Sequence, residues 1–214
     1  CSETGSYELC KQTHFNIVSS GHEQQATVEA SLIHAYGGCA SMPDAQEVFN
    51  GCTDPNIVSW NACIGGHAHG GEGHSQARSF RIFEEMIFHA RVDADEVTFA
   101  ALLSCCGYIG SILQGLFCLE FMVQVHGLKP DIKHYGSIID LLGRAGDFKR
   151  VEHMLGMKRN IHVKPDLNVW LSLLGACQVH GNLEFGEAIF SCAIRLEPGE
   201  EAAYVLMSNI YAES

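Results

Sequence analysis

A small group of histidines close to one cysteine could bind a metal ion. His67, His69 and His74 follow Cys63 along a glycine-rich stretch, and imidazole nitrogen and thiolate sulfur are both ligands of zinc. The spacing of these four residues matches no closed zinc motif, and the stretch has the composition of a loop. We therefore predict that the group is structural and that the chain needs no metal or other cofactor.

The ten cysteines could form disulfides, bind metal or fill the core. The adjacent pair at 105 and 106 is badly placed to bridge, because neighbours on a helix point to different faces. Cys177 and His180 precede a turn and match no metal motif. Several cysteines lie on predicted helix stripes among apolar residues, where a thiol behaves as a small hydrophobic group; these are Cys39, Cys63, Cys105, Cys106 and Cys177. We predict reduced, structural cysteines in a reducing compartment.

The sequence lacks the motifs of the common catalytic sites. A nucleotide deaminase holds zinc with an H-x-E…P-C-x-x-C pattern and uses the glutamate to shuttle protons, and no C-x-x-C occurs in this chain. Phosphate-binding loops, dinucleotide-binding glycine motifs and the serine elbow are also missing. We therefore predict that the chain is not an enzyme.

The charge of the chain is uneven. Its formal net charge of −12 opposes the phosphate neutralisation that drives nucleic-acid binding. Residues 1–126 have a net charge of −10 and residues 167–214 one of −5, whereas residues 127–166 have a net charge of +3. The basic residues of this middle segment could contact phosphates or form a solvated helix face; they are Lys129, Lys133, Arg144, Lys149, Arg150, Lys158, Arg159 and Lys164.

The sequence contains no recognisable membrane or targeting segment. There is no run of 18 uncharged apolar residues, so we expect no membrane span. The first 21 residues lack a charged region followed by an apolar one, so no signal or transit segment is visible in them.

The elements that would position all these residues come from an internal repeat. A similar apolar motif is opened five times by an aromatic residue: Trp60, Phe99, Tyr135, Trp170 and Tyr204. The spacings are 39, 36, 35 and 34 residues, and a sixth copy without the aromatic begins at Glu29. A period in the thirties is typical of supersecondary units stacked in one array.

Each unit is predicted to contain two helices. The first helix carries apolar residues at helical spacing and stops near a glycine such as Gly107 or Gly110, because glycine tolerates a left-handed conformation. An amphipathic second helix follows. Prolines then separate the units, and each proline precedes a residue suited to cap the next helix, namely Asn56, Asp131 or Asp166.

We therefore predict an all-α fold, a right-handed α-solenoid of helix-turn-helix repeats with a superhelix like that of tetratricopeptide repeats. Four full units span residues 26–56, 57–95, 96–131 and 132–166. Residues 1–25 are expected to supply only the second helix of a partial repeat. A further unit is expected over residues 167–200, and an incomplete one from Glu201.

Four stretches carry a specific family resemblance: Ile57–Ala62 (IVSWNA), Asp95–Phe99 (DEVTF), Asp140–Gly146 (DLLGRAG) and Leu173–Cys177 (LLGAC). They resemble the pentatricopeptide repeat family, in its plant PLS subclass, where repeats of three lengths alternate. The resemblance extends over nearly the whole chain. Residues 167–214 resemble a truncated E-type motif, in which residues 167–200 are similar to the motif after the last repeat and Tyr204–Ala212 to the start of the second such motif.

The resemblance implies a sequence-specific binder of single-stranded RNA in a mitochondrion or chloroplast. Proteins with E-type tails specify sites of cytidine-to-uridine RNA editing. The chain would then direct this modification with a deaminase supplied elsewhere, by a following domain or by an editing-factor protein held through residues 167–214. Two alternatives stay open: a protein–protein interaction scaffold, which the acidic charge favours, and a degenerate fragment that binds nothing.

By the same resemblance, the fifth residue of a first helix and the last residue of the unit read one base, and the second residues of consecutive units sandwich it. In the 57–95 unit these residues are Asn61 and Asp95, flanked by Val58 and Val97. An asparagine amide has a donor and an acceptor, so it can match the mixed edge of uracil. The alternative is that Asp95 only caps the next helix and that Asn61 is a solvated surface residue.

The remaining units offer weaker RNA-binding pairs: Ala30 with Asn56, Ala100 with Asp131, and Gly136 with Asp166. Alanine and glycine have no side-chain donor or acceptor, and the aspartates are suited to cap helices. The 57–95 unit is also longer than usual, with the excess in residues 65–74 and just after Met86. This excess could shift the register of the unit on an RNA.

Overall fold

The computed structural model describes residues 2–21, 25–69, 73–156 and 165–213. All regular secondary structure in these four stretches is helical, and none of the helices there is long and apolar enough to cross a membrane. In chain order the helices are α1 (Ser2–Ser19), α2 (Ala26–Gly38), α3 (Met42–Gly51), α4 (Ile57–His69), α5 (Gly73–Glu84), η1 (Glu85–His89), α6 (Glu96–Ile109), α7 (Ile112–Gln124), α8 (Ile132–Arg144), α9 (Phe148–Leu155), α10 (Leu167–His180), α11 (Leu183–Leu196) and α12 (Glu201–Glu213).

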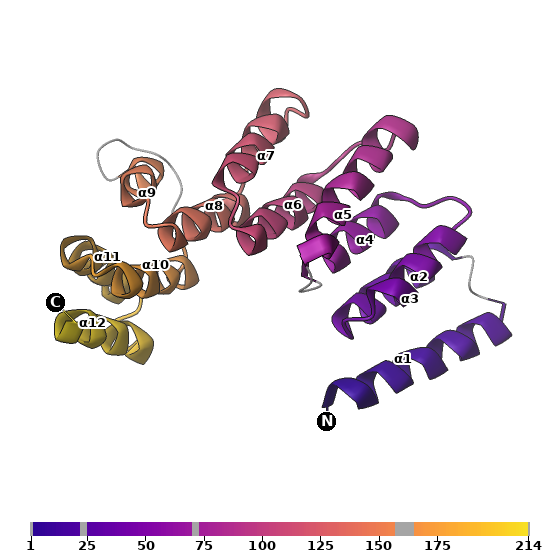
Figure 1. Ribbon diagram of the computed structural model, residues 1–214, viewed down its shortest axis with the longest axis horizontal. Helices are drawn as coiled ribbons and strands as arrows, with labels where there is room; N and C mark the ends of the chain where they lie inside the picture. Colours follow the sequence, from indigo (N-terminus) through magenta and orange to yellow (C-terminus); the bar gives the residue numbers. More distant parts are fainter. Residues whose placement is uncertain (1, 22–24, 70–72, 157–164, 214) are drawn as a thin grey trace.

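The helices form two layers that run along an arc (Figure 1). In the inner layer, α2, α4, α6, α8, α10 and α12 each pack against the next, so the layer is continuous. The partner helices α3, α5, α7, α9 and α11 each pack against the inner helix of their own pair, and α1 packs against α2. Figure 1 shows α5, α7 and α9 on the outer side of the arc. This stack of helical pairs confirms the predicted all-α solenoid.

The repeated aromatic residue joins neighbouring units in the core. Phe99 is fully buried, and its ring centroid lies 5.9 Å from that of Phe83 on α5 and 6.4 Å from that of Phe121 on α7. Trp60 on α4 packs in the same way on Phe49 of α3, with 4.7 Å between the ring centroids. These edge-on and tilted arrangements are the ones that aromatic rings prefer. Since each unit shares its rings with a neighbour, the units are stable only as a stack.

The helix ends follow the chemistry predicted from the sequence. The side chains of Asn56, Asp131 and Asp166 accept hydrogen bonds of 2.9–3.2 Å from backbone N–H groups in the first turns of α4, α8 and α10. Those N–H groups have no partner inside the helix. At the other end of α6, Gly110 adopts a φ of 73°. Gly107, the other predicted stop, lies inside α6 instead, because the chain turns left-handed only at Gly110.

Part of the extra length of the 57–95 unit is accommodated at the end of its second helix. There α5 continues into η1, a π-helical turn in which the Ala90 N–H donates to the Glu85 carbonyl at 3.0 Å. A π turn holds one more residue than an α turn without ending the helix. Arg91 follows with a left-handed φ of 54°. The excess predicted after Met86 corresponds to this turn, whereas residues 70–72 of the other predicted excess lie outside the described stretches.

We expect Phe99→Ala to lower the free energy of unfolding by about 3–5 kcal/mol, because it leaves a cavity where three helices meet. Phe117→Ala is the matched control, since Phe117 is 64% exposed on α7, and it should cost less than about 1 kcal/mol. Urea unfolding followed by circular dichroism measures both. A midpoint for Phe99→Ala as high as that of the control would contradict the assigned core.

Candidate nucleic-acid interface

Asn61, Asp95 and Thr98 form a hydrogen-bonded group where α4 meets the start of α6. Nδ2 of Asn61 donates to Oδ1 of Asp95 at 2.9 Å, and Oγ1 of Thr98 donates to Oδ1 of Asn61 at 2.6 Å. Asp95 is the N-cap of α6: its Oδ1 accepts the Thr98 backbone N–H at 2.9 Å, and its own N–H donates to Oγ1 of Thr98 at 3.2 Å. Asp95 therefore caps α6 and anchors Asn61 with the same carboxylate.

The amide of Asn61 keeps hydrogen-bonding capacity that no protein group uses within this network. One Nδ2 hydrogen and one lone pair of Oδ1 remain, and the side chain is only half-buried. Val58 lies one turn before Asn61 on α4, and Val97 adjoins Thr98 on α6; they are 55% and 59% exposed. One donor and one acceptor thus remain at opposite ends of the amide, near two exposed apolar side chains.

The other predicted reading positions do not form such a group. Ala30 is buried, with 5% of its surface exposed, so it presents almost nothing to a ligand. Asn56 is engaged in capping α4. Ala100 and Gly136 are half-buried and have no polar side-chain atom, and Asp166 is an exposed cap of α10. Of the four predicted pairs, all within the described stretches, only Asn61 and Asp95 are joined by a side-chain hydrogen bond.

Asp131 caps α8 and is bound to His134, a partner that the sequence did not predict. His134 is 1% exposed; its Nδ1 lies 2.5 Å from Oδ1 of Asp131, and its Nε2 donates to the Glu96 backbone carbonyl at 2.8 Å. Partial burial raises the pKa of Asp131, but hydrogen bonds from His134 outweigh it and hold the pKa below its usual value. A cap residue followed three positions later by a polar side chain is the signal that would have revealed both Thr98 and His134.

The basic residues of the middle segment are spread over both layers. Lys133 and Arg144 lie on the inner helix α8, Lys149 and Arg150 on the outer helix α9, and Lys129 in the connection between α7 and α8. The guanidinium of Arg144 is paired with Asp140 at 2.7 Å. Three further basic residues fall outside the described stretches: Lys158, Arg159 and Lys164. The described residues therefore place two cations of this group on the inner layer.

A cleft of about 330 Å³ opens between α6 and α8 on the inner layer. Ser104 and Tyr108 line it from α6, and they follow Val97 at helical spacing, so they continue the face that carries Val97. Asp140 and Arg144 line it from α8. Tyr108 is 59% exposed. The inner layer thus offers an aromatic ring and a guanidinium further along the same face.

The predicted histidine–cysteine group makes internal hydrogen bonds. Cys63 and His67 both approach Oε1 of Gln46, at 3.8 and 3.1 Å. Burial raises the pKa of Cys63 to about 12 and lowers the pKa of His67 to about 4, so both are neutral at pH 7. The side chains of His69 and His74 lie outside the described part of the chain. Within the described residues no three potential ligands gather around one point, and the cysteines there are free thiols.

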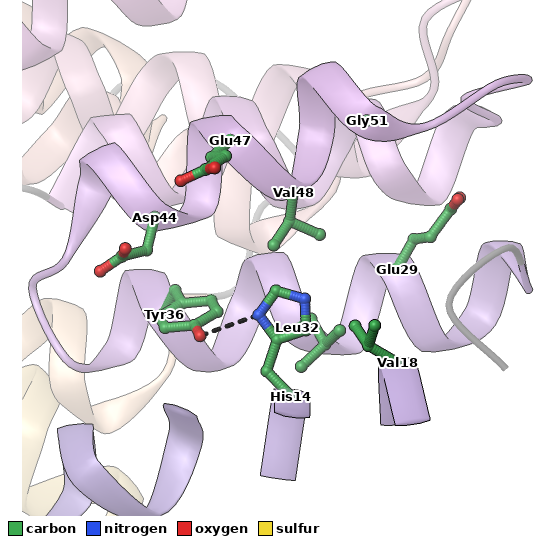
Figure 2. A pocket seen from close by; sticks show the side chains of 9 residues that line it. All are labelled: His14, Val18, Glu29, Leu32, Tyr36, Asp44, Glu47, Val48 and Gly51. Carbon is green, nitrogen blue, oxygen red and sulfur yellow. Dashed lines mark hydrogen bonds between the residues drawn. The ribbon is translucent and has the colours of Figure 1, made fainter. Parts of the chain in front are cut away.

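A second pocket, of about 410 Å³, lies between α1, α2 and α3 (Figure 2). Nδ1 of His14 lies 3.0 Å from the hydroxyl of Tyr36 across its middle, as Figure 2 shows. At one end, Asp44 accepts hydrogen bonds from the hydroxyls of Ser41 and Tyr7, which lower the pKa of its carboxyl. These bonds join α1 to α2 and α3, so we assign the polar groups of this pocket a structural role.

The fold and the Asn61 group define a class of protein: a helical-repeat solenoid with a hydrogen-bonded group of polar side chains on its inner layer. A family model described as a pentatricopeptide repeat domain matches residues 121–179. ELI1 from Arabidopsis thaliana, a chloroplastic pentatricopeptide repeat-containing protein, is 36% identical over 99% of this chain and 33% of its own length. CRR2, also chloroplastic and from the same plant, is 35% identical over 100% of this chain and 32% of its own length.

The chain belongs to the pentatricopeptide repeat family. It spans about a quarter to a third of the length of the curated relatives it matches.

Solved structures share the fold. The pentatricopeptide repeat domain of protein-only RNase P 1 from Arabidopsis thaliana, solved in complex with tRNA, has a TM-score of 0.65 and 14% identity over 84% of this chain and 95% of that chain. PPR10 from maize, in complex with an 18-nt psaJ RNA element, has a TM-score of 0.62 and 16% identity over 99% of this chain and 31% of that chain. At these identities the likeness concerns the fold alone.

Asp131→Ala should lower the free energy of unfolding by about 1 kcal/mol at neutral pH, because α8 loses its cap. The pKa of Asp131 is depressed in the folded chain, so its stabilising effect is present above the usual aspartate pKa of about 3.9 and is lost as the pH falls through the folded value. Urea unfolding at several pH values should therefore show the difference from wild type shrinking below about pH 4.

Asp54→Ala is the matched control, because Asp54 is an exposed aspartate in a bend before α4; it should change stability by less than about 0.5 kcal/mol. A difference for Asp131→Ala that stays constant down to the lowest pH at which the chain folds would show that the cap does not act through its charge.

Proposed function

We propose that this chain binds single-stranded RNA along its inner helical layer and that Asn61 reads a uracil base. The observation that carries the proposal is the tethered amide, which Asp95 and Thr98 hold at 2.9 and 2.6 Å. The remaining Nδ2 hydrogen can be donated to O4 of uracil, or the remaining lone pair of Oδ1 can accept its N3–H. Val58 and Val97 would contact the two faces of that base. Helical repeats of this kind read about one base per repeat with two or three side chains.

Further contacts along the inner layer support the same function. The exposed ring of Tyr108 could stack on a base, and Arg144 could approach a phosphate, because stacking and backbone contacts together hold single strands. The acidic charge of −12 works against this binding, so we expect modest affinity that falls steeply with salt. With one polar reading pair in the described residues, this chain would select a site only together with the rest of a longer protein.

Asn61→Ala should weaken the binding of oligouridine about tenfold and leave the binding of oligocytidine nearly unchanged, because it removes the hydrogen bond between the amide and uracil. Fluorescence anisotropy with labelled oligonucleotides, at about 50 mM and about 200 mM salt, measures both affinities and the contribution of phosphates. Asn50→Ala, on the outer helix α3, is the matched control and should change neither affinity.

Two outcomes would contradict this proposal. Equal losses for both oligonucleotides in Asn61→Ala would show that Asn61 does not discriminate between bases. Failure of the wild-type chain to bind either oligonucleotide at the lower salt would overturn RNA binding and favour a protein-interaction scaffold or a degenerate fragment.

We further propose that the RNA is organellar and that the bound site is one of cytidine-to-uridine editing, with the deaminase supplied elsewhere. In this proposal residues 26–166 form four repeats, and residues 167–214 form a truncated E-type motif that holds the deaminase or another editing factor. The sequence resemblance of that tail supports the proposal. The chloroplastic names of ELI1 and CRR2 support an organelle, either chloroplast or mitochondrion.

Editing in trans tests this part of the proposal. A purified deaminase domain of this family, added to an RNA with a cytidine downstream of a uridine site, should edit that cytidine faster when the chain is present. The Asn61→Ala chain should give less stimulation in proportion to its weaker uridine binding. An edited fraction that is the same with and without the wild-type chain would contradict a role in editing.

A further inference from the structure

Pairs of aromatic rings join neighbouring units of the solenoid. Phe49 of α3 and Trp60 of α4 lie edge to face, with 4.7 Å between their ring centroids. Phe190 of α11 and Tyr204 of α12 lie in the same way at 5.2 Å. In each pair, a ring on the second helix of one unit packs against the aromatic residue that opens the next unit. The two rings together fill the junction with apolar surface.

The junction between α1 and α2 lacks this pair. Glu29 is the residue of α2 that corresponds to Trp60 of α4 in the repeated motif. Val18 on α1 precedes Glu29 by 11 positions, and the aromatic residue of α3 precedes Trp60 by the same interval. Val18 and Glu29 both line the pocket of about 410 Å³ between α1, α2 and α3 (Figure 2). A pocket therefore lies where the next junction has two rings.

The pocket combines apolar walls with a buried carboxylate. Leu32 and Val48 line it together with Val18. Glu29 is only 6% exposed, and Figure 2 shows it at the opposite end of the pocket from Asp44. The volume lies within the range of about 300–1,000 Å³ that is usual for small-molecule sites, which combine apolar walls with a few polar groups.

The carboxylate of Glu29 forms no ion pair within the described residues. The thiol of Cys52 is a partner, but its single hydrogen is shared with the carbonyl of Val48 at 3.3 Å, and a thiol is a weak donor. Burial and the hydrogen bond to Glu29 raise the pKa of Cys52 to about 12, so the thiol is neutral at pH 7. A buried carboxylate needs a stronger partner than this, and an ammonium group would supply one.

The surroundings of Glu29 favour a positive charge. Gly51, which also lines the pocket, is the last residue of α3, and the C-terminus of a helix carries a partial negative charge. Asp44 and Glu47 add two further carboxylates to the lining. These charges attract a cation and repel an anion.

We propose that this pocket binds a small aromatic amine. The ring lies against Val18, Leu32 and Val48, in the place of the missing aromatic pair, and the ammonium group pairs with Glu29. The hydrogen bonds around Asp44 keep their structural role at the other end. The bound ring joins α1 to α2 as the aromatic pair joins α3 to α4. The site uses no residue of the Asn61 group, so it does not depend on RNA binding.

Tryptamine and indole-3-propionate test the proposal, because both carry an indole ring and their side chains have opposite charges. Titrations of the whole chain, followed in its methyl NMR signals, should give a Kd for tryptamine of about 1 mM or below. Indole-3-propionate should bind at least about tenfold more weakly. Equal affinities, or no binding of tryptamine at about 10 mM, would overturn the proposal. The methyl signals of Leu32 and Val48 should shift with tryptamine; shifts that leave both unchanged place the ligand elsewhere and also overturn it.

Glu29→Gln tests the charged partner, since it keeps the shape of the side chain and removes its charge. It should weaken tryptamine binding about tenfold. Glu120→Gln is the matched control, because Glu120 is an exposed carboxylate on α7, and it should leave the affinity unchanged. Wild-type affinity in Glu29→Gln would show that the amine does not pair with this carboxylate. The comparison of the two indole compounds on the wild-type chain decides the proposal even if Glu29→Gln fails to fold.

Discussion

Contact between consecutive inner helices is the constraint on which the rest of the molecule depends. One helical pair cannot bury its own apolar face, and here the rings of Phe83, Phe99 and Phe121 close a core that belongs to two units at once. The Asn61 group has the same dependence, because the amide comes from α4, whereas its two partners are the N-cap of α6 and a residue of the first turn of α6. A site of this kind exists only where two units are already stacked, so folding of the array and assembly of the site are one event.

The cap of α6 and the anchor of Asn61 are the same atom, Oδ1 of Asp95. A carboxylate at a helix N-terminus is stabilised by the unpaired N–H groups and by the helix dipole, and the Asp95 carboxylate accepts such an N–H group, that of Thr98, in the first turn of α6. The same oxygen accepts the hydrogen bond from the nitrogen of Asn61. The capped junction between units is thus rigid for reasons of stability, and the rigidity is what a hydrogen-bonding site needs.

The sequence predicts the parts of the molecule that follow from local chemistry. The period of the aromatic residues, the proline breaks and the caps at Asn56 and Asp131 all lead to the observed helices. The pairing of Asn61 with Asp95 follows from the family resemblance, and the structure brings the two side chains to 2.9 Å. Thr98 was missed as a partner of Asn61 because the contact joins residues 37 positions apart. Burial at Ala30 depends on how α2 packs, which no single stretch of sequence reveals.

The two layers of the arc respond differently to bending. Inner helices touch along the whole described stack, whereas α5, α7 and α9 have few direct contacts with one another (Figure 1). When the arc bends, the separations between successive outer helices increase or decrease, whereas the closely packed inner helices keep their separations. Residues on successive inner helices therefore keep a nearly constant spacing along the arc when it bends.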